Sequence, residues 1–374
     1  MFVAVALVAA CSGGAGDSAP PATEEAAADT STPSSSGKAA EPATAFPPHP
    51  DGVPFPTEEW PEAAWPSNVD RTAVDQAVDT SSAEGGSPRV RAVVVVHGGE
   101  IVYERYSPNR ADGRSVTMPG FSMAKSLTSA LAGILVREGR LDVDAPAAVP
   151  AWGGTSDPRH AITLDHLLRM SSGLDWTERP HEADMFPMLA ADDGAAYAAG
   201  KELVAEPGTR FLYSTGDTML VSRILADEVG SGSDFREFVD AELLDKVGIA
   251  RLDMDFDPGG TWYGGVSFET TARNFAKFGL LYLRDGVWDG ERILPDGWVD
   301  YSRTPIVANG EYGAGWWLDP ERPGVMYAVG VDGQVITVDP EHDLTFVQLA
   351  TDGASDISLA VSEAILDAFA AADG

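Results

Sequence analysis

The feature that most constrains the fold of this chain is the position of its strand-forming segments, which lie at the two ends of the folded part. A β-branched run at residues 89–96 is followed by a Gly-Gly turn and an apolar segment at 101–106, a pattern typical of a β-hairpin. Three more segments alternate or run apolar between Gly, Asp and Pro turns, at 326–329, 334–338 and 344–349. Strands at both ends with helices between them predict an α+β fold, in which an antiparallel sheet is flanked by helices and carries an inserted all-helical subdomain.

Apolar residues at helical spacing fill the region between the strands. One helix that ends near Gly139 is predicted by the spacing of Met123, Leu127, Leu131, Ile134 and Leu135. We expect the helical subdomain at about residues 140–255 and a last helix at about 355–371. The active cleft is expected at the junction between the sheet and the helical subdomain.

The single cysteine, Cys11, directly follows an apolar run that is too short to span a bilayer as a helix. Val8-Ala9-Ala10-Cys11 followed by Ser-Gly-Gly resembles a bacterial lipobox, and the alternative is an unmodified cysteine in an ordinary signal peptide. We expect residues 1–11 to be a lipoprotein signal peptide ending at the lipidated Cys11. The protein is then an extracytoplasmic, secreted bacterial lipoprotein, held at the cell membrane only through this N-terminal lipid.

Composition separates a tether from a folded domain. Residues 12–50 are mainly Ala, Ser, Thr, Pro, Gly and Glu, which cannot offset chain entropy by burial, so they predict a disordered tether before a domain at 51–374. Acidic residues outnumber basic ones 58 to 25, which argues against partners such as nucleic acid or an anionic membrane surface. The domain has no cysteine, so disulfides, thiolate metal sites and a cysteine nucleophile are excluded there.

The motif with chemical content is Ser122-Met123-Ala124-Lys125, at the start of the first predicted helix. This spacing places a hydroxyl and an amine one turn apart on the same face, and the helix N-terminus favours negative charge there. A lysine can activate a serine if desolvation or a neighbouring cation lowers the lysine pKa. The same spacing recurs at Ser35 and Lys38 in the tether, so the alternative is a capping serine and a solvated lysine.

Four segments together resemble a known family. Residues 121–128, 166–174, 211–217 and 264–277 are similar, in this order, to recurrent blocks of the serine beta-lactamase and penicillin-binding protein superfamily. More narrowly they resemble the class C beta-lactamase-related esterases and the 6-aminohexanoate-dimer-hydrolase-like enzymes, over roughly residues 85–350. The resemblance implies a beta-lactamase/transpeptidase-like fold and a serine hydrolase that needs no cofactor.

The resemblance also implies roles for individual residues. Ser122 would be the nucleophile, Lys125 its base, and Tyr213 the group that shuttles the proton to the leaving group. The backbone amides of Ser122 and Gln334 would form the oxyanion hole. The alternative for Tyr213 is a half-buried structural tyrosine.

Two positions depart from the family pattern. The element Lys-Thr-Gly or His-x-Gly, which the family carries on a strand, aligns here with Val331-Asp332-Gly333. Val331 cannot bind a carboxylate, although Gly333 still allows close approach of a substrate, and Asp332 either orients the substrate or is an exposed turn residue. Thr215 replaces an asparagine that usually contacts the substrate. Both losses argue against efficient beta-lactam hydrolysis and favour short-chain esters or uncharged amides.

Other residues receive less specific interpretations. Lys201, Lys246 and Lys277 are expected to be surface cations, and Trp316-Trp317 to lie in the core or in the cleft wall. The histidines lack metal-binding spacing, so no metal site is predicted. The segment Trp176 to Gly200 is expected to overhang the cleft.

These observations predict a monomeric serine hydrolase that cleaves a small ester or amide through an acyl-enzyme on Ser122. One alternative is a D,D-peptidase or beta-lactamase that acts on cell-wall peptides or beta-lactams. An alternative from another class is a catalytically inactive binding or sensor lipoprotein, which the loss of a cation at Val331 favours and the intact Ser122, Lys125 and Tyr213 oppose.

Overall fold

A computed structural model describes the chain at residues 46–47, 50, 52–82, 89–107, 113–154, 156–178, 184–351 and 359–372, all of which belong to one compact unit. Cys11 and the predicted signal peptide lie outside these residues, as does most of the predicted tether. At the end of that tether, Phe46 packs against the core, with the Arg303 guanidinium 5.4 Å from its ring centroid. Within the described ranges, no helix has the length and apolar character needed to cross a bilayer.

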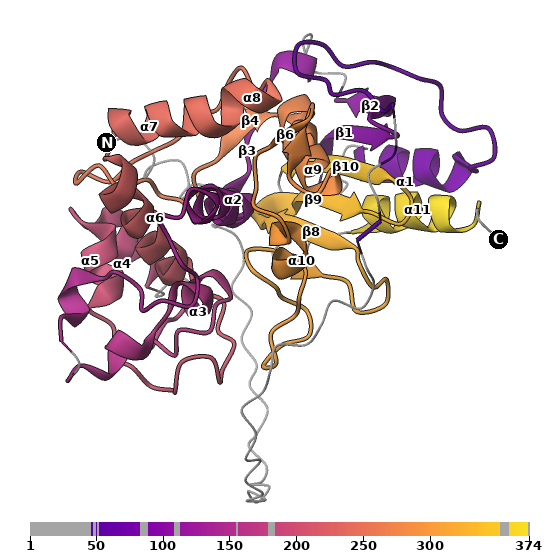
Figure 1. Cartoon of the computed structure of the whole chain (residues 1–374). Coiled ribbons are helices and arrows are strands. Elements are labelled where there is room, and N and C mark those ends of the chain that lie inside the picture. The colour runs from indigo at the N-terminus through magenta and orange to yellow at the C-terminus, as the bar shows by residue number, and fades with distance from the viewer. Residues whose placement is uncertain are drawn as a thin grey trace, which may run out of the picture. The chain divides into compact units, whose positions relative to one another are not determined.

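The centre of the fold is a six-stranded antiparallel sheet in the order β2-β1-β10-β9-β8-β7 (Figure 1). Its strands are β1 Arg89–His97, β2 Glu100–Tyr106, β7 Trp317–Leu318, β8 Met326–Gly330, β9 Gln334–Asp339 and β10 Leu344–Thr351. The predicted hairpin is confirmed by the pairing of β1 with β2, and the three predicted C-terminal strands are β8, β9 and β10. The N-terminal strands join the C-terminal ones where β1 pairs with β10.

Both faces of the sheet are covered by helices, which explains the uninterrupted apolar run in β1. Val93 and Val95 pack in one cluster with helices α1 (Thr72–Ser82) and α11 (Ala360–Ala370). Val94 and Val96 belong to the larger core on the opposite face, where α9 (Ala272–Leu283) lies against the sheet (Figure 1). The last helix was predicted from about residue 355, but Leu359 is not helical and α11 begins at Ala360.

The remaining elements connect the sheet to the helical part of the chain. The helices are α2 Ala124–Arg137, α3 Leu164–Leu168, α4 Met185–Ala190, α5 Gly194–Ala199, α6 Thr215–Val229, α7 Ser233–Val239, α8 Asp245–Val247 and α10 Trp298–Ser302. The short strand pairs are β3 Thr117–Pro119 with β4 Glu269–Thr271, and β5 Val287–Trp288 with β6 Glu291–Arg292. Single 3₁₀ turns occur at Gly113–Ser115, Phe121–Met123, Pro150–Trp152, Pro158–Ala161 and Val331–Gly333, and a π-helical turn at Asp240–Leu244.

Helix α2 lies between the helical region and the sheet (Figure 1) and is buried from Ala124 to Leu135. Such a position requires its polar side chains to be hydrogen-bonded. The hydroxyl groups of Ser126 and Thr128 donate to the carbonyls of Gly315 (2.6 Å) and Gly264 (2.8 Å). These bonds fix α2 to segments on both sides of the helix.

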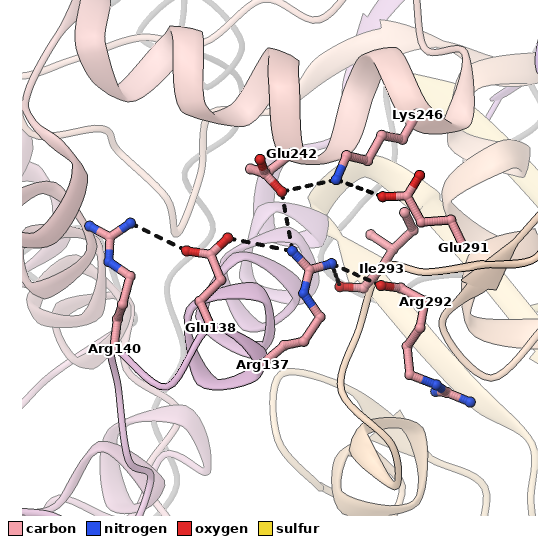
Figure 2. A network of polar contacts seen from close by, with 8 residues as sticks. All are labelled: Arg137, Glu138, Arg140, Glu242, Lys246, Glu291, Arg292 and Ile293. Atoms are coloured by element: carbon pink, nitrogen blue, oxygen red, sulfur yellow. Dashed lines mark hydrogen bonds and ion pairs between the residues drawn. The ribbon is translucent and has the colours of Figure 1, made fainter.

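The C-terminal end of α2 is held by a network of charged residues (Figure 2). Arg137 donates to the carbonyl of Ile293 (2.7 Å) and contacts Glu242 (3.1 Å). Lys246 lies between Glu242 (3.0 Å) and Glu291 (2.8 Å), so this lysine, predicted to be a surface cation, is a partly exposed ion-pair partner. The network supports the orientation of the helix at the end opposite Ser122.

The prediction for Lys277 was wrong. Lys277 lies on α9, is 5% exposed, and donates to the carbonyls of Thr57 (3.0 Å) and Gly248 (2.5 Å). Burial lowers the pKa of Lys277 to about 8. The segment before α1 covers this face of α9, and a local sequence pattern does not reveal which distant segment will cover a lysine.

Candidate active site

Ser122 lies on a sharp turn between β3 and α2. Phe121 has φ +48°, a left-handed conformation that costs energy for a residue with a side chain and is frequent at functional sites. The Gly120 amide donates to the carbonyl of Phe268 (2.6 Å), and the Gly120 carbonyl accepts from the Met123 amide (3.1 Å). These bonds hold the turn on both sides of Phe121 and Ser122.

The end of strand β8 also fixes this turn. Gly330 packs so closely that a Cβ atom built on it would lie 2.1 Å from the Gly120 carbonyl oxygen. The 3₁₀ turn containing Ser122 contacts both β8 and β9. Gly330 is therefore required for the close approach of β8 to the segment that carries Ser122.

The predicted pair of hydroxyl and amine is present. The Lys125 Nζ atom lies 3.1 Å from Ser122 Oγ, and Lys125 is 3% exposed. The other two contacts of Nζ are with Thr215 Oγ1 (3.0 Å) and the carbonyl oxygen of Gly265 (2.9 Å). The three hydrogens of an ammonium group thus have three acceptors.

Tyr213 also lies at this site, as the sequence predicted. Lys125 Nζ is 4.7 Å from the centroid of the Tyr213 ring, which is a cation–π contact. The ring stacks on Trp317 at 5.5 Å and meets Tyr312 edge-on at 6.0 Å. Trp316 is fully buried in the core, whereas Trp317 is partly exposed beside Tyr213.

Thr215 is buried, and its side chain is engaged within the protein. Besides accepting from Lys125 Nζ, the Thr215 hydroxyl donates to Glu178 Oε1, and the Thr215 amide donates to Glu178 Oε2 (2.9 Å). The indole nitrogen of Trp176 also donates to Glu178 Oε2 (2.6 Å). The structure therefore joins Thr215 to the lysine rather than presenting its hydroxyl to a substrate.

Glu178 was not singled out by sequence reasoning. It matches no motif, and the one signal was its position in the segment expected to overhang the cleft, of which residues 179–183 lie outside the described residues. The contact arises because α6 brings Thr215 beside a residue that precedes it by 37 positions. Only the packing of the helical region shows that Glu178 belongs to this site.

A second carboxyl group, Asp217, lies beneath the site at the start of α6. Its Oδ1 atom accepts from the hydroxyls of Ser172 (2.9 Å) and Ser214 (3.2 Å), and its amide donates to Ser214 Oγ (2.9 Å). Complete burial raises the pKa of Asp217 to about 7, against the opposite effect of the two serine hydroxyls. Asp217 thus joins two of the sequence blocks next to Tyr213.

The third sequence element lies in the turn between two of the predicted strands, whereas the family pattern carries this element on a strand. Val331, Asp332 and Gly333 form a 3₁₀ turn between β8 and β9 rather than part of a strand, because Asp332 (φ +66°) and Gly333 (φ +86°) both adopt left-handed conformations. Gln334 follows as the first residue of β9. Its side chain donates to the Ala350 carbonyl (2.6 Å) on β10.

No group of three or more His, Cys, Asp or Glu side chains within the described residues is arranged to hold a metal ion. The chemistry that these residues offer is nucleophilic. A hydroxyl on a strained turn, a buried amine and a partly exposed aromatic wall lie together at the junction of the sheet and the helices.

The fold and this site define a serine hydrolase. Residues 74–368 match the family model described as Beta-lactamase, so the chain belongs to the beta-lactamase family, which confirms the predicted resemblance. Over 289 residues it is 28% identical to the 6-aminohexanoate-dimer hydrolase of Paenarthrobacter ureafaciens, covering 70% of this chain and 72% of that protein.

Solved structures confirm the fold class. A Bacillus anthracis protein provisionally described as a 6-aminohexanoate-dimer hydrolase has a TM-score of 0.70 and 21% identity, over 84% of this chain and 87% of its own. A family VIII carboxylesterase has a TM-score of 0.59 and 17% identity, over 82% of this chain and 99% of its own. At these identities the likeness shows the fold alone.

Proposed function

We propose that this protein hydrolyses a short-chain ester or an uncharged amide through a covalent acyl-enzyme on Ser122. The observation that carries the proposal is the 3.1 Å contact between Ser122 Oγ and Lys125 Nζ at the start of a buried helix in a chain of the beta-lactamase family. A buried amine can serve as the base that a serine hydroxyl needs to become a nucleophile.

The proposed reaction has two stages. In acylation, the Lys125 amine takes the proton of Ser122, Oγ attacks the carbonyl carbon, and the backbone amides of Ser122 and Gln334 bind the oxyanion. Tyr213 then delivers a proton to the leaving alcohol or amine. In deacylation, water attacks the acyl-enzyme, releases the acid and returns the proton to Ser122.

The walls of the site favour a substrate without a carboxylate. Val331 offers no cation, and the Thr215 hydroxyl is engaged by Lys125 and Glu178. Tyr213 and Trp317 present aromatic surface instead. We therefore propose that Val331, Asp332 and Gly333 line the site but do not bind a substrate carboxylate through a charge. The activities named for two similar proteins, a 6-aminohexanoate-dimer hydrolase and a carboxylesterase, are consistent with ester and amide substrates.

We also propose that the enzyme is a monomer, anchored outside the cytoplasmic membrane by lipid on Cys11. The support for the anchor is the lipobox-like sequence at residues 8–14 and the Ala-, Ser- and Pro-rich segment after it. The intact mass of the mature protein from a bacterial membrane tests the modification, because lipidation adds a diacylglyceryl group to Cys11.

The test of the proposed activity is turnover of p-nitrophenyl acetate and butyrate, beside nitrocefin, by the purified full chain. We expect Ser122-dependent ester hydrolysis, a loss on the order of 10³-fold in Ser122→Ala, and no turnover of nitrocefin. Ser67→Ala is the matched control, because Ser67 is exposed and precedes α1. Equal ester turnover in wild type and Ser122→Ala would contradict the proposal, and rapid nitrocefin hydrolysis would replace it with a beta-lactamase.

A further inference from the structure

The arrangement around Lys125 poses a problem for its role as a base. In the ammonium form, Nζ donates to Ser122 Oγ, Thr215 Oγ1 and the Gly265 carbonyl, so no lone pair faces Ser122. The Tyr213 ring centroid lies 4.7 Å from Nζ, so the ring covers another side of the same nitrogen. Lys125 must lose one proton before it can take the proton of Ser122, and that proton needs an acceptor.

A hydrogen-bonded chain leads from Lys125 to a carboxylate. Nζ donates to Thr215 Oγ1 at 3.0 Å, and the same hydroxyl donates to Glu178 Oε1. The other carboxylate oxygen, Oε2, accepts from the amide of Thr215 and the indole of Trp176, which holds Glu178 in place and directs Oε1 to the hydroxyl. A hydroxyl that accepts from one group and donates to the next can pass a proton without rearrangement of heavy atoms.

We propose that Glu178 is the proton acceptor that converts Lys125 into the base for Ser122, with the Thr215 hydroxyl as the relay between them. This inference rests on the proposed function, because it concerns the same nucleophile. Nζ gives one proton to Thr215 Oγ1 as that hydroxyl gives its own proton to Glu178 Oε1. The ammonium and carboxylate become an amine and a carboxylic acid, the total charge is unchanged, and the lone pair of the amine accepts the Ser122 proton.

Other titratable groups face this relay without belonging to the hydrogen-bonded chain. Asp217 on α6 and Tyr312 both interact electrostatically with Glu178, and each of their pKa values is raised, mainly by burial and partly by the charge of Glu178. Tyr213 faces Lys125 through its ring. A pH profile of the relay therefore has to be compared between variants in which only one of these groups changes.

The relay determines the direction of the pH dependence. In wild type, Ser122 can no longer be activated once Glu178 has been protonated from solvent. Lys125 and Glu178 then both carry a proton, so Glu178 cannot accept the proton of Lys125. In Glu178→Gln the amide cannot take a proton, so Lys125 must release its proton to solvent before it can act as the base. An ordinary lysine pKa lies about six above an ordinary glutamate pKa, and burial can lower a lysine pKa by up to about five. We therefore expect the acid limb of the profile to move up by at least about one pH unit.

The experiment measures the rate at which a fluorophosphonate labels Ser122 in the full chain between pH 5 and 10, with intact mass as the readout. We expect Glu178→Gln and Thr215→Val to share the alkaline shift of the acid limb, so that labelling still rises with pH in both variants over the range in which the wild-type rate is constant. Thr215→Ser keeps the hydroxyl and should restore the wild-type limb. Asp175→Asn is the matched control, because Asp175 is an exposed carboxylate in the same segment.

Other results of the labelling experiment would contradict the relay. If Glu178 only holds Lys125 as a cation, its removal lowers the lysine pKa, the limb moves to lower pH, and the proposal is overturned. An unshifted limb in Glu178→Gln overturns it as well. If wild-type Ser122 is labelled but no ester is turned over, the proposed hydrolysis is refuted, and the relay is still supported when the acid limb of Glu178→Gln shifts to higher pH. If Ser122 is not labelled at any pH, both proposals are overturned.

Discussion

Replacing Gly330 by alanine should separate the sheet from the turn that carries Ser122. The added Cβ would lie 2.1 Å from the Gly120 carbonyl oxygen, and Cβ atoms in proteins essentially never approach within 3.0 Å. The two backbones must therefore move apart by about 1 Å. The Gly120 carbonyl also accepts from the Met123 amide, so the displacement acts directly on the segment between Gly120 and Met123.

The expected size of the effect follows from this displacement. A misplacement of about 1 Å at a reacting group can reduce the rate by about 10²-fold. Overpacking of this kind costs roughly 1–3 kcal/mol of unfolding free energy, which corresponds to a decrease of a few degrees in Tm. Gly330→Ala should therefore remain folded while kcat/KM for p-nitrophenyl butyrate falls on the order of 10²-fold.

The assay compares ester kinetics and thermal unfolding of wild type, Gly330→Ala and Gly310→Ala. Gly310 is the matched control, because it is exposed, lacks a positive φ, and would leave an added Cβ with no neighbouring atom within 4 Å. Gly310→Ala should keep both wild-type values. If Gly330→Ala keeps wild-type kcat/KM with the same Tm, the close approach of β8 does not position Ser122 and this reasoning is refuted.

Two predictions concern buried titratable groups, each measured as the unfolding free energy against pH in urea. In the folded protein the pKa of Asp217 is raised from 3.8 to about 7. The contribution of Asp217 to the free energy of unfolding is therefore fully present below about pH 4 and is lost as the pH rises through 7. Asp217→Asn should remove this loss, and an unchanged profile would contradict it. The folded pKa of Lys277 is lowered from 10.5 to about 8, so stability relative to Lys277→Met should rise between pH 8 and 10.5. A flat difference would show that the Lys277 ammonium is fully stabilised by its two carbonyl acceptors.

The strands were predictable where a periodic apolar pattern continued over several residues. The run at Arg89–His97 is apolar without interruption because both faces of β1 are covered by helices. Strand β7 is only Trp317–Leu318 and pairs with β8 at its edge, which is too short to leave a pattern. The turn at Val331–Gly333 falls between the predicted strands 326–329 and 334–338, and its Asp and Gly residues are types that tolerate the left-handed conformation observed there.

The sequence by itself determined the proximity of Ser122 and Lys125, because residues three positions apart at the start of a helix are neighbours. Only the tertiary structure decided what surrounds the lysine. Thr215 follows Lys125 by 90 positions, and Glu178 precedes Thr215 by 37, so the contacts among the three residues depend on how α2 packs against α6. Among 58 acidic residues, no local pattern distinguishes the one that the packing of distant helices brings to the site, because that choice is set by contacts summed over the whole core.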